Sequence, residues 1–150
     1  MIYWDTSALV KLYVPEPDSH VFLDILAGSD AAVVTADIAS VEVLCTLHRK
    51  EAAGDLRPNG AEELFERYLA DTHSGRIMLI PNGRDITTTA RRLVAHAYQH
   101  TPPLFIRSLD ALHIASAIIA SADAVIATDK RLRDVATLMG LAVLPEDPNG

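Results

Sequence analysis

Short, continuously apolar segments alternate with helix-like patterns along the chain. Strands that show no polar alternation are typical of parallel sheets, because helices cover such sheets on both faces. The segments MIYW, AAVVTAD, RIMLI, AVIAT and LAVLP have this character, and a helix pattern follows each of the first four. We therefore predict one domain over residues 1–150 with an α/β fold, a three-layer α/β/α sandwich around a mainly parallel sheet.

The helix patterns between these segments would supply the two outer layers. Two of them, over residues 59–74 and 85–99, are strongly amphipathic, and the second directs Tyr98 inward together with Ile86 and Leu93. Such faces more often pack on a core than bind a partner. The remaining helices are expected over residues 6–14, from 18 to Gly28, from 38 to Gly54, over 108–121, and over 130–139 before Gly140.

Composition narrows the classes of function. The chain is 49% hydrophobic and 22% charged, as in globular proteins, and its net charge of −7 argues against a generally basic surface that coats nucleic acid. The single cysteine, Cys45, excludes an internal disulfide and a zinc site built from several cysteines, and it fits a reducing compartment. No signal-peptide pattern is present, and the longest uncharged segment, Ala111–Ala122, is shorter than the roughly 20 residues of a membrane span. We expect a cytoplasmic protein with no membrane segment.

Acidic residues stand at the ends of segments that should be buried. Asp5 follows the first predicted strand and Asp129 follows the fourth, whereas Glu42 and Asp110 lie in apolar helices. Ligands of an open parallel sheet bind beyond the carboxyl ends of its strands, near the point where the strand order reverses. We therefore expect the carboxylates of these four residues to converge at that edge of the sheet.

Most of the acids also have a structural explanation when taken alone. Glu42 fits such an explanation least, because it lies more than one turn inside its predicted helix. It could still be a surface glutamate, since Cys45, Thr46 and Arg49 share its helical face. The others fit helix N-caps (Asp5, Asp37 and Asp129), a first-turn acid (Asp110) and a turn between helix and strand (Asp123).

Four carboxylates in one crevice would require positive charge between them. Two carboxylates about 4 Å apart repel by roughly 4 kcal/mol at an effective dielectric constant near 20. Divalent cations relieve this repulsion, and a site built only from oxygen ligands is typical of Mg²⁺ or Mn²⁺. Removing four negative charges from the net charge of −7 leaves −3, which is ordinary for a protein surface.

Four segments resemble, in order and spacing, the acidic motifs of the PIN-domain ribonucleases, and in particular those of VapC-like toxins of toxin–antitoxin pairs. These segments are MIYWDTSALVKLY, IASVEVLCTL, LDALHIASA and IATDKRL. The resemblance covers nearly the whole chain. It implies a PIN-like fold and a metal-dependent endoribonuclease in which a metal-activated water attacks the RNA phosphodiester. It also implies metal-binding and catalytic roles for Asp5, Glu42, Asp110 and Asp129.

The resemblance extends to side chains next to the acids. Thr6 and Ser7 match hydroxyl positions that hold a carboxylate or a water molecule. Many relatives keep a hydroxyl two positions before the last acid, where this chain has Ala127, so a role for the adjacent Thr128 stays open. His113, one turn after the third acid, fits either a residue that supports the metal ligands or a histidine of the core or of an interface.

Basic residues near the acids have two readings. Lys130, Arg131 and Arg133 follow the last acid, and Lys11 lies one helix length after the first. They would bind RNA phosphates or form a solvated basic helix face. Sequence-specific ribonucleases usually recognise unpaired bases, so a structured RNA loop is the expected class of substrate.

The resemblance implies two protein partners, a second copy in a homodimer and a cognate antitoxin. Such an antitoxin covers the acidic groove, often with a basic side chain. The alternative function is a non-catalytic PIN-like binding module or scaffold, which would typically have lost one of the four acids. A phosphate-transfer enzyme with a nucleophilic aspartate would need a strand-end Asp-x-Asp, and a receiver-like module would need an acidic pair, but MIYWDTS has only one acid.

Overall fold

The five apolar segments form the five strands of one sheet in the computed structural model, which describes residues 1–146. All neighbouring strands are parallel, and their order across the sheet is β3-β2-β1-β4-β5. The predicted parallel sheet is therefore confirmed. The strands are β1 (Ile2–Trp4), β2 (Val33–Ala36), β3 (Ile77–Ile80), β4 (Ala124–Ile126) and β5 (Ala142–Leu144).

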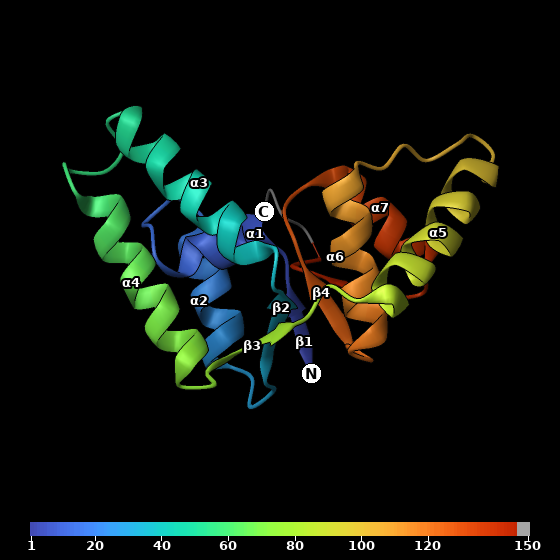
Figure 1. The fold of residues 1–150 in the computed structure, drawn as a ribbon, viewed down its shortest axis with the longest axis horizontal. Helices are drawn as coiled ribbons and strands as arrows, with labels where there is room; N and C mark the ends of the chain where they lie inside the picture. Colours follow the sequence, from blue (N-terminus) through green and yellow to red (C-terminus); the bar gives the residue numbers. More distant parts are fainter. Residues whose placement is uncertain (147–150) are drawn as a thin grey trace.

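Helices cover both faces of the sheet, as the three-layer prediction required (Figure 1). One layer comprises α1 (Thr6–Leu9), a 3-10 turn (Val10–Leu12), α2 (Ser19–Ala27), α3 (Ala39–Ala52) and α4 (Gly60–His73). The other comprises α5 (Arg84–Gln99), α6 (Ser108–Ile119) and α7 (Lys130–Leu138). None of the helices in the described part of the chain is long and apolar enough to cross a membrane.

The strand order reverses beside β1, and this fixes where a ligand site can form. From β1 the chain builds outward through β2 to β3, and it then adds β4 and β5 on the other side of β1. Trp4 pairs with Ile126, so the residues that follow β1 and β4 emerge side by side at the carboxyl edge. This is the crevice in which open α/β sheets bind ligands.

The sheet separates two apolar cores, and β1 contributes to both because successive strand residues point to opposite faces. Tyr3 packs with the layer of α5, α6 and α7, whereas Trp4 packs with the layer of α1 to α4. Both rings are almost completely buried. Large aromatic groups anchored on both faces hold β1 at the centre of the sheet, and they thereby fix the position of Asp5, which follows it.

The structure corrects two expectations about side chains. Tyr98, predicted to face inward, is 46% exposed and packs edge-to-face on Phe105 with 5.7 Å between the ring centroids. This contact forms because the segment after α5 folds back on the helix, where the Leu104 amide donates to the Ala97 carbonyl. Asp37 does not cap α3 with its side chain, since its Oδ2 instead accepts from the Asn82 amide at 3.1 Å, across the ends of β2 and β3.

Candidate active site

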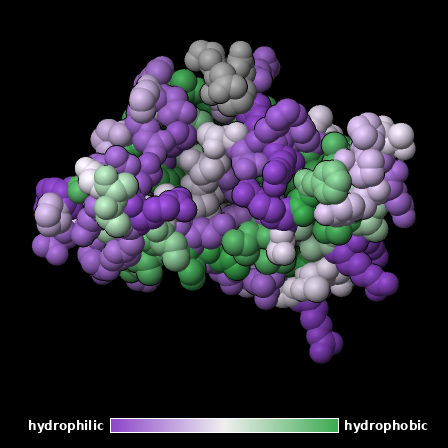
Figure 2. Space-filling view, turned by 90° about the horizontal axis from the view of Figure 1, so that it is seen from above, coloured by the Kyte–Doolittle hydropathy of each residue, from purple (hydrophilic) through white to green (hydrophobic). Residues whose placement is uncertain are grey.

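The four predicted acids line one pocket of about 470 Å³ at the carboxyl edge of the sheet. Asp5 follows β1, Glu42 lies on α3, Asp110 lies on α6 and Asp129 follows β4. In Figure 2, which looks down on this edge, a large group of hydrophilic side chains lies beside the hollow between the two helix layers. The pocket also contains three of the predicted accessory residues, namely Thr6, Ser7 and Thr128.

Asp5 combines a structural role with a place in the pocket. Its Oδ2 caps α1 by accepting hydrogen bonds from the Ser7 amide at 3.1 Å and the Ser7 hydroxyl at 2.5 Å. Its Oδ1 points the other way, 3.6 Å from His113 Nε2. The Ser7 hydroxyl also accepts from the Thr128 amide at 3.1 Å, which ties the end of β1 to the end of β4. The N-cap reading and the active-site reading are thus both compatible with this geometry.

Glu42 is not a surface glutamate of α3. The helix begins at Ala39, so Glu42 lies in its first turn rather than deeper, and its side chain is only 25% exposed. Its Oε2 accepts hydrogen bonds from Thr6 Oγ1 at 2.8 Å and from His113 Nε2 at 2.5 Å. Burial raises the pKa of Glu42, but the His113 and Thr6 hydrogen bonds outweigh burial and the net pKa lies below its ordinary value. The carboxylate is therefore held ionised inside the pocket.

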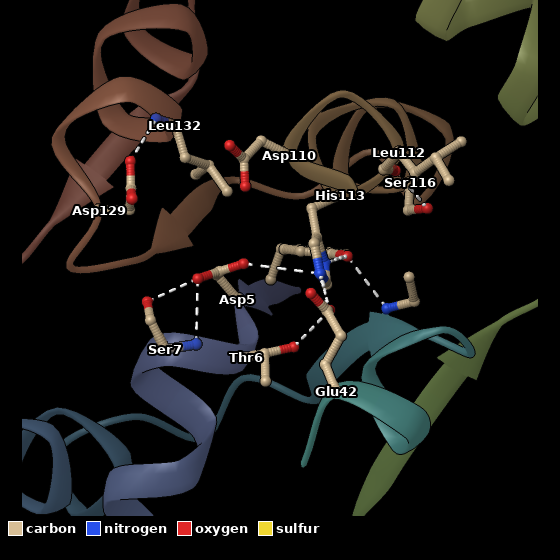
Figure 3. Close-up of polar contacts among 12 residues, drawn as sticks. Asp5, Thr6, Ser7, Glu42, Asp110, Leu112, His113, Ser116, Asp129 and Leu132 are labelled. Carbon is tan, nitrogen blue, oxygen red and sulfur yellow. Dashed lines mark hydrogen bonds and ion pairs between the residues drawn. The ribbon is translucent and has the colours of Figure 1, made fainter. Parts of the chain in front are cut away.

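His113 links Glu42 to the centre of the sheet. The ring is 1% exposed, and its Nδ1 lies 2.7 Å from the Tyr3 hydroxyl, which itself accepts from the Ala36 amide at 3.0 Å. With the Tyr3 proton donated to Nδ1, Nε2 carries the proton that Glu42 accepts. Burial lowers the pKa of His113, but the Glu42 hydrogen bond and the nearby acids outweigh burial and raise it. Figure 3 shows His113 between Asp110 and Glu42, with Asp5 beside it.

Asp110 and Asp129 share one guanidinium, that of Arg107. Arg107 Nε donates to Asp110 Oδ2 at 2.8 Å, and Nη2 donates to Asp110 Oδ1 at 3.3 Å and to Asp129 Oδ2 at 2.8 Å. The other oxygen of Asp129 caps α7, accepting from the Arg131 amide at 2.8 Å. The hydrogen bond and charge of Asp110 raise the pKa of Arg107, so its positive charge is secure. One guanidinium thus bridges two carboxylates and offsets one of their two negative charges.

The acids share a pocket but do not form a compact ligand cluster. Among residues 1–146, no three His, Cys, Asp or Glu side chains are gathered closely enough to hold a metal ion. The donor set nevertheless suits a hard cation, since the acids that line the pocket offer carboxylate oxygens only. The Arg107 guanidinium acts as a stand-in cation between Asp110 and Asp129, which shows that this position accepts positive charge.

The basic residues around the pocket differ in part from those expected. Lys11 lines it as predicted, and it forms ion pairs with Glu16 and Asp18. Arg49 and Lys50 on α3 also line it, and the sequence signal for Arg49 was its position on the same helical face as Glu42.

The basic residues at the start of α7 have other surroundings. Lys130 pairs with Asp134, and Arg131 borders a separate pocket beside Phe105. Arg133 donates to the carbonyls of Ala127, Leu144 and Pro145, so it holds the chain that follows β5. These contacts support a structural role for Arg133 and not the binding of RNA phosphates.

Comparison with known proteins identifies the family of this chain. The PIN domain family matches residues 2–138. Ribonuclease VapC47 of Mycobacterium tuberculosis (strain CDC 1551 / Oshkosh) is 30% identical over 120 residues, which cover 78% of this chain and 74% of that protein.

Two solved structures share the fold. VapBC2 from Rickettsia felis, bound to a DNA fragment from its promoter, aligns with a TM-score of 0.68 and 17% identity over 95% of this chain and 97% of that chain. FitAcB from Neisseria gonorrhoeae aligns with a TM-score of 0.69 and 19% identity over 99% of this chain and 98% of that chain. With a family match across most of its length and VapC47 as a relative, the chain belongs to the PIN-domain family and is a VapC-like member of it.

Proposed function

We propose that this protein is a metal-dependent endoribonuclease, the toxin of a toxin–antitoxin pair. The observation that carries the proposal is the placement of Asp5, Glu42, Asp110 and Asp129 around one pocket at the strand-order reversal. The relative named Ribonuclease VapC47 supports cleavage of RNA as the reaction. The presence of all four acids favours an enzyme over a non-catalytic PIN-like scaffold.

Asp5, Asp110 and Asp129 are the residues that would hold Mg²⁺ or Mn²⁺. All three line the pocket, and each keeps an oxygen that does not cap a helix: Asp5 Oδ1 lies near His113, and Oδ2 of Asp110 and of Asp129 accept from Arg107. When bound, the cation supplies an activated water and neutralises the charge that builds on the phosphodiester. Asp5 and Asp129 have to keep their positions with and without the cation. Each is held by its other oxygen, because Asp5 caps α1 and Asp129 caps α7.

Glu42 would orient the attacking water from the α3 side of the pocket. Thr6 and His113 both bond its Oε2, so its Oε1 is the oxygen left to accept from a water molecule. Ser7 and Thr128 hold the ends of β1 and β4 together, which sets the spacing between Asp5 and Asp129. His113 therefore acts as a positioning residue for Glu42.

RNA would approach along the basic side of the same pocket. Arg49 and Lys50 lie on α3 beyond Glu42, and Lys11 on the 3-10 turn lies close to Lys50, because both lysines form ion pairs with Glu16. Arg49 donates to Thr46 and is the member of this set without an ion pair among those described. We therefore assign its guanidinium to the RNA phosphate next to the phosphate that is cleaved. Lys130 and Arg131, exposed at the start of α7, would meet phosphates farther along.

Two protein partners belong to the proposal. A cognate antitoxin is supported by the resemblance of the four acidic segments to VapC-like toxins of toxin–antitoxin pairs, together with the likeness in fold to VapBC2 and FitAcB. A homodimer is supported by the large apolar side chains exposed along α5, α6 and the segment between them. These side chains are Tyr98, Phe105, Leu109 and Ile119.

Cleavage of a structured RNA by the purified full chain tests the proposal. Cleavage should require Mg²⁺ or Mn²⁺, stop when the cation is chelated, and be lost in Asp110→Asn. Asp24→Asn is a matched control, because Asp24 is an exposed acid on α2 outside the pocket. Cleavage that persists at the wild-type rate in Asp110→Asn would contradict the assigned site.

A further inference from the structure

We infer that Arg107 is an internal counter-cation of the active site, which a divalent cation has to displace from Asp110 and Asp129 before it can bind. The inference rests on the proposed function, because it concerns the cation that the four acids would take. It adds a residue outside the predicted site: a guanidinium that competes with the cation for the same oxygens.

The contacts of Arg107 coincide with the expected ligand atoms. One guanidinium bonds both oxygens of Asp110, at 2.8 and 3.3 Å, and Oδ2 of Asp129 at 2.8 Å. The remaining oxygen of Asp129 is used as the cap of α7. All the oxygens that these two acids turn toward the pocket are therefore occupied by Arg107.

Arg107 can leave this position without disturbing the fold. Its side chain is 57% exposed, whereas that of Asp110 is 10% exposed. Its carbonyl accepts from the Ala111 amide at 3.0 Å, so the backbone stays fixed at the start of α6 while the side chain moves. A guanidinium released from the acids would enter solvent at the pocket mouth, where hydration replaces the lost bonds. The acids, in contrast, cannot move away from the pocket.

The exchange makes cation binding and the Arg107 ion pairs mutually exclusive. A guanidinium offers planar donors that match two carboxylates, and a divalent cation needs the same lone pairs. Without either partner, Asp110 and Asp129 would repel one another. Arg107 thus stabilises the cation-free protein, and the free energy of its ion pairs is subtracted from the free energy of cation binding.

Calorimetric titration of the full chain with Mn²⁺, without RNA, tests this inference. Arg107→Met should bind Mn²⁺ about tenfold more tightly than wild type, within the usual range of coupling between two competing ligands. Its melting temperature without Mn²⁺ should fall, and its rise on adding Mn²⁺ should exceed that of wild type. Arg49→Met is the matched control, since it removes the same charge from the same pocket but from a residue that bonds Thr46 rather than an acid.

The outcomes separate this inference from the proposed function. If wild type binds Mn²⁺ and Arg107→Met binds it no more tightly, the inference is overturned and the proposed cation site stands. It is equally overturned if Arg49→Met tightens binding as much as Arg107→Met does, because general charge would then explain the effect. If neither wild type nor Arg107→Met binds Mn²⁺, both ideas fail. Should Arg107→Met not fold, Arg107→Lys keeps the charge but not the planar fork, and it should still bind Mn²⁺ more tightly than wild type.

Discussion

His113 Nε2 lies 2.5 Å from Glu42 Oε2 and thereby joins α6 to α3 across the carboxyl edge of the sheet. The ring is held from behind by the Tyr3 hydroxyl, which is bonded in turn to the Ala36 amide of β2. A buried chain of hydrogen bonds therefore runs from the backbone of the central strands to an acid of the pocket. Its effect is to give Glu42 one orientation.

Removing the Tyr3 hydroxyl tests this chain while leaving every pocket residue in place. In Tyr3→Phe the ring still fills the core, but Nδ1 of His113 loses its partner and the ring can turn away from Glu42. Because residues that orient catalytic groups typically cost 10- to 100-fold when altered, we expect kcat for RNA cleavage to fall by about tenfold with little change in KM. Tyr13→Phe, which removes a hydroxyl bonded to Asp71 instead, is the control and should leave kcat unchanged. If Tyr3→Phe keeps the wild-type kcat, the Tyr3 hydroxyl is not needed to orient the His113 ring toward Glu42.

Glu16 gives a pH dependence of stability that is separate from the four acids. Burial raises its pKa, but ion pairs with Lys11 and Lys50 outweigh burial and lower the net pKa. A carboxyl whose folded pKa is lowered adds stability above its unfolded pKa, and this stability is lost as the pH falls through the folded value. We expect Glu16→Gln to lower the free energy of unfolding at pH 7 by about 1 kcal/mol, and the difference from wild type to vanish on acidification below the ordinary range of glutamate. Denaturant unfolding at several pH values measures this, and a pH-independent difference would contradict it.

Arg49 should affect RNA binding rather than chemistry. Each phosphate contact to a single strand contributes about 0.7 to the slope of log affinity against log salt concentration. Arg49→Ala should therefore weaken RNA binding and reduce that slope by about 0.7. Arg76→Ala removes a charge that is paired with Asp71 outside the acid pocket, so it should leave the slope unchanged. If Arg49→Ala and wild type show equal salt slopes, Arg49 does not contact an RNA phosphate.

Phe105 is the most exposed of the large apolar side chains, at 67%. If it lies in a homodimer interface, Phe105→Glu should shift a two-fold dimer to monomer at tens of micromolar, an order-of-magnitude concentration for weak dimers. Leu23→Glu, at another exposed apolar position on α2, serves as the control. Sedimentation that finds wild type monomeric at this concentration would count against the dimer. If Leu23→Glu dissociates the dimer and Phe105→Glu does not, the interface contains Leu23 instead of Phe105.

The sequence predicted those features that depend on local patterns. Apolar segments predicted all five strands. The strand ends also predicted the position of Asp5 and Asp129, because an acid directly after a buried parallel strand lies at the carboxyl edge of the sheet. The caps that Asp5 and Asp129 form were also visible as local signals. The sequence pattern puts Glu42 deeper in its helix than the structure does, because Asp37 fits an N-cap by pattern but bonds the Asn82 amide instead, and α3 begins only at Ala39.

The features that were missed are contacts between distant segments made by long side chains. Arg107 reaches Asp129 across 22 residues of sequence, and Tyr3 reads as an ordinary core residue until His113 is seen beside it. If the acids only repelled one another, neutralising any one of them would preserve or raise stability without metal. Asp110 does not fit this simple case, since Asp110→Asn would give up the ion pair with Arg107 as well as a repulsion.

Asp5 is the acid on which the central claim can be tested most directly, because asparagine caps a helix about as well as aspartate and α1 should survive the change. The measurement is a paired one on wild type and Asp5→Asn: melting temperature with and without Mn²⁺, and cleavage of a structured RNA. We predict nearly equal melting temperatures without Mn²⁺, a Mn²⁺-induced rise in wild type that is lost in Asp5→Asn, and no cleavage by the variant. If Asp5→Asn keeps both the Mn²⁺-induced rise and the cleavage, the acids at the carboxyl edge are not the active site.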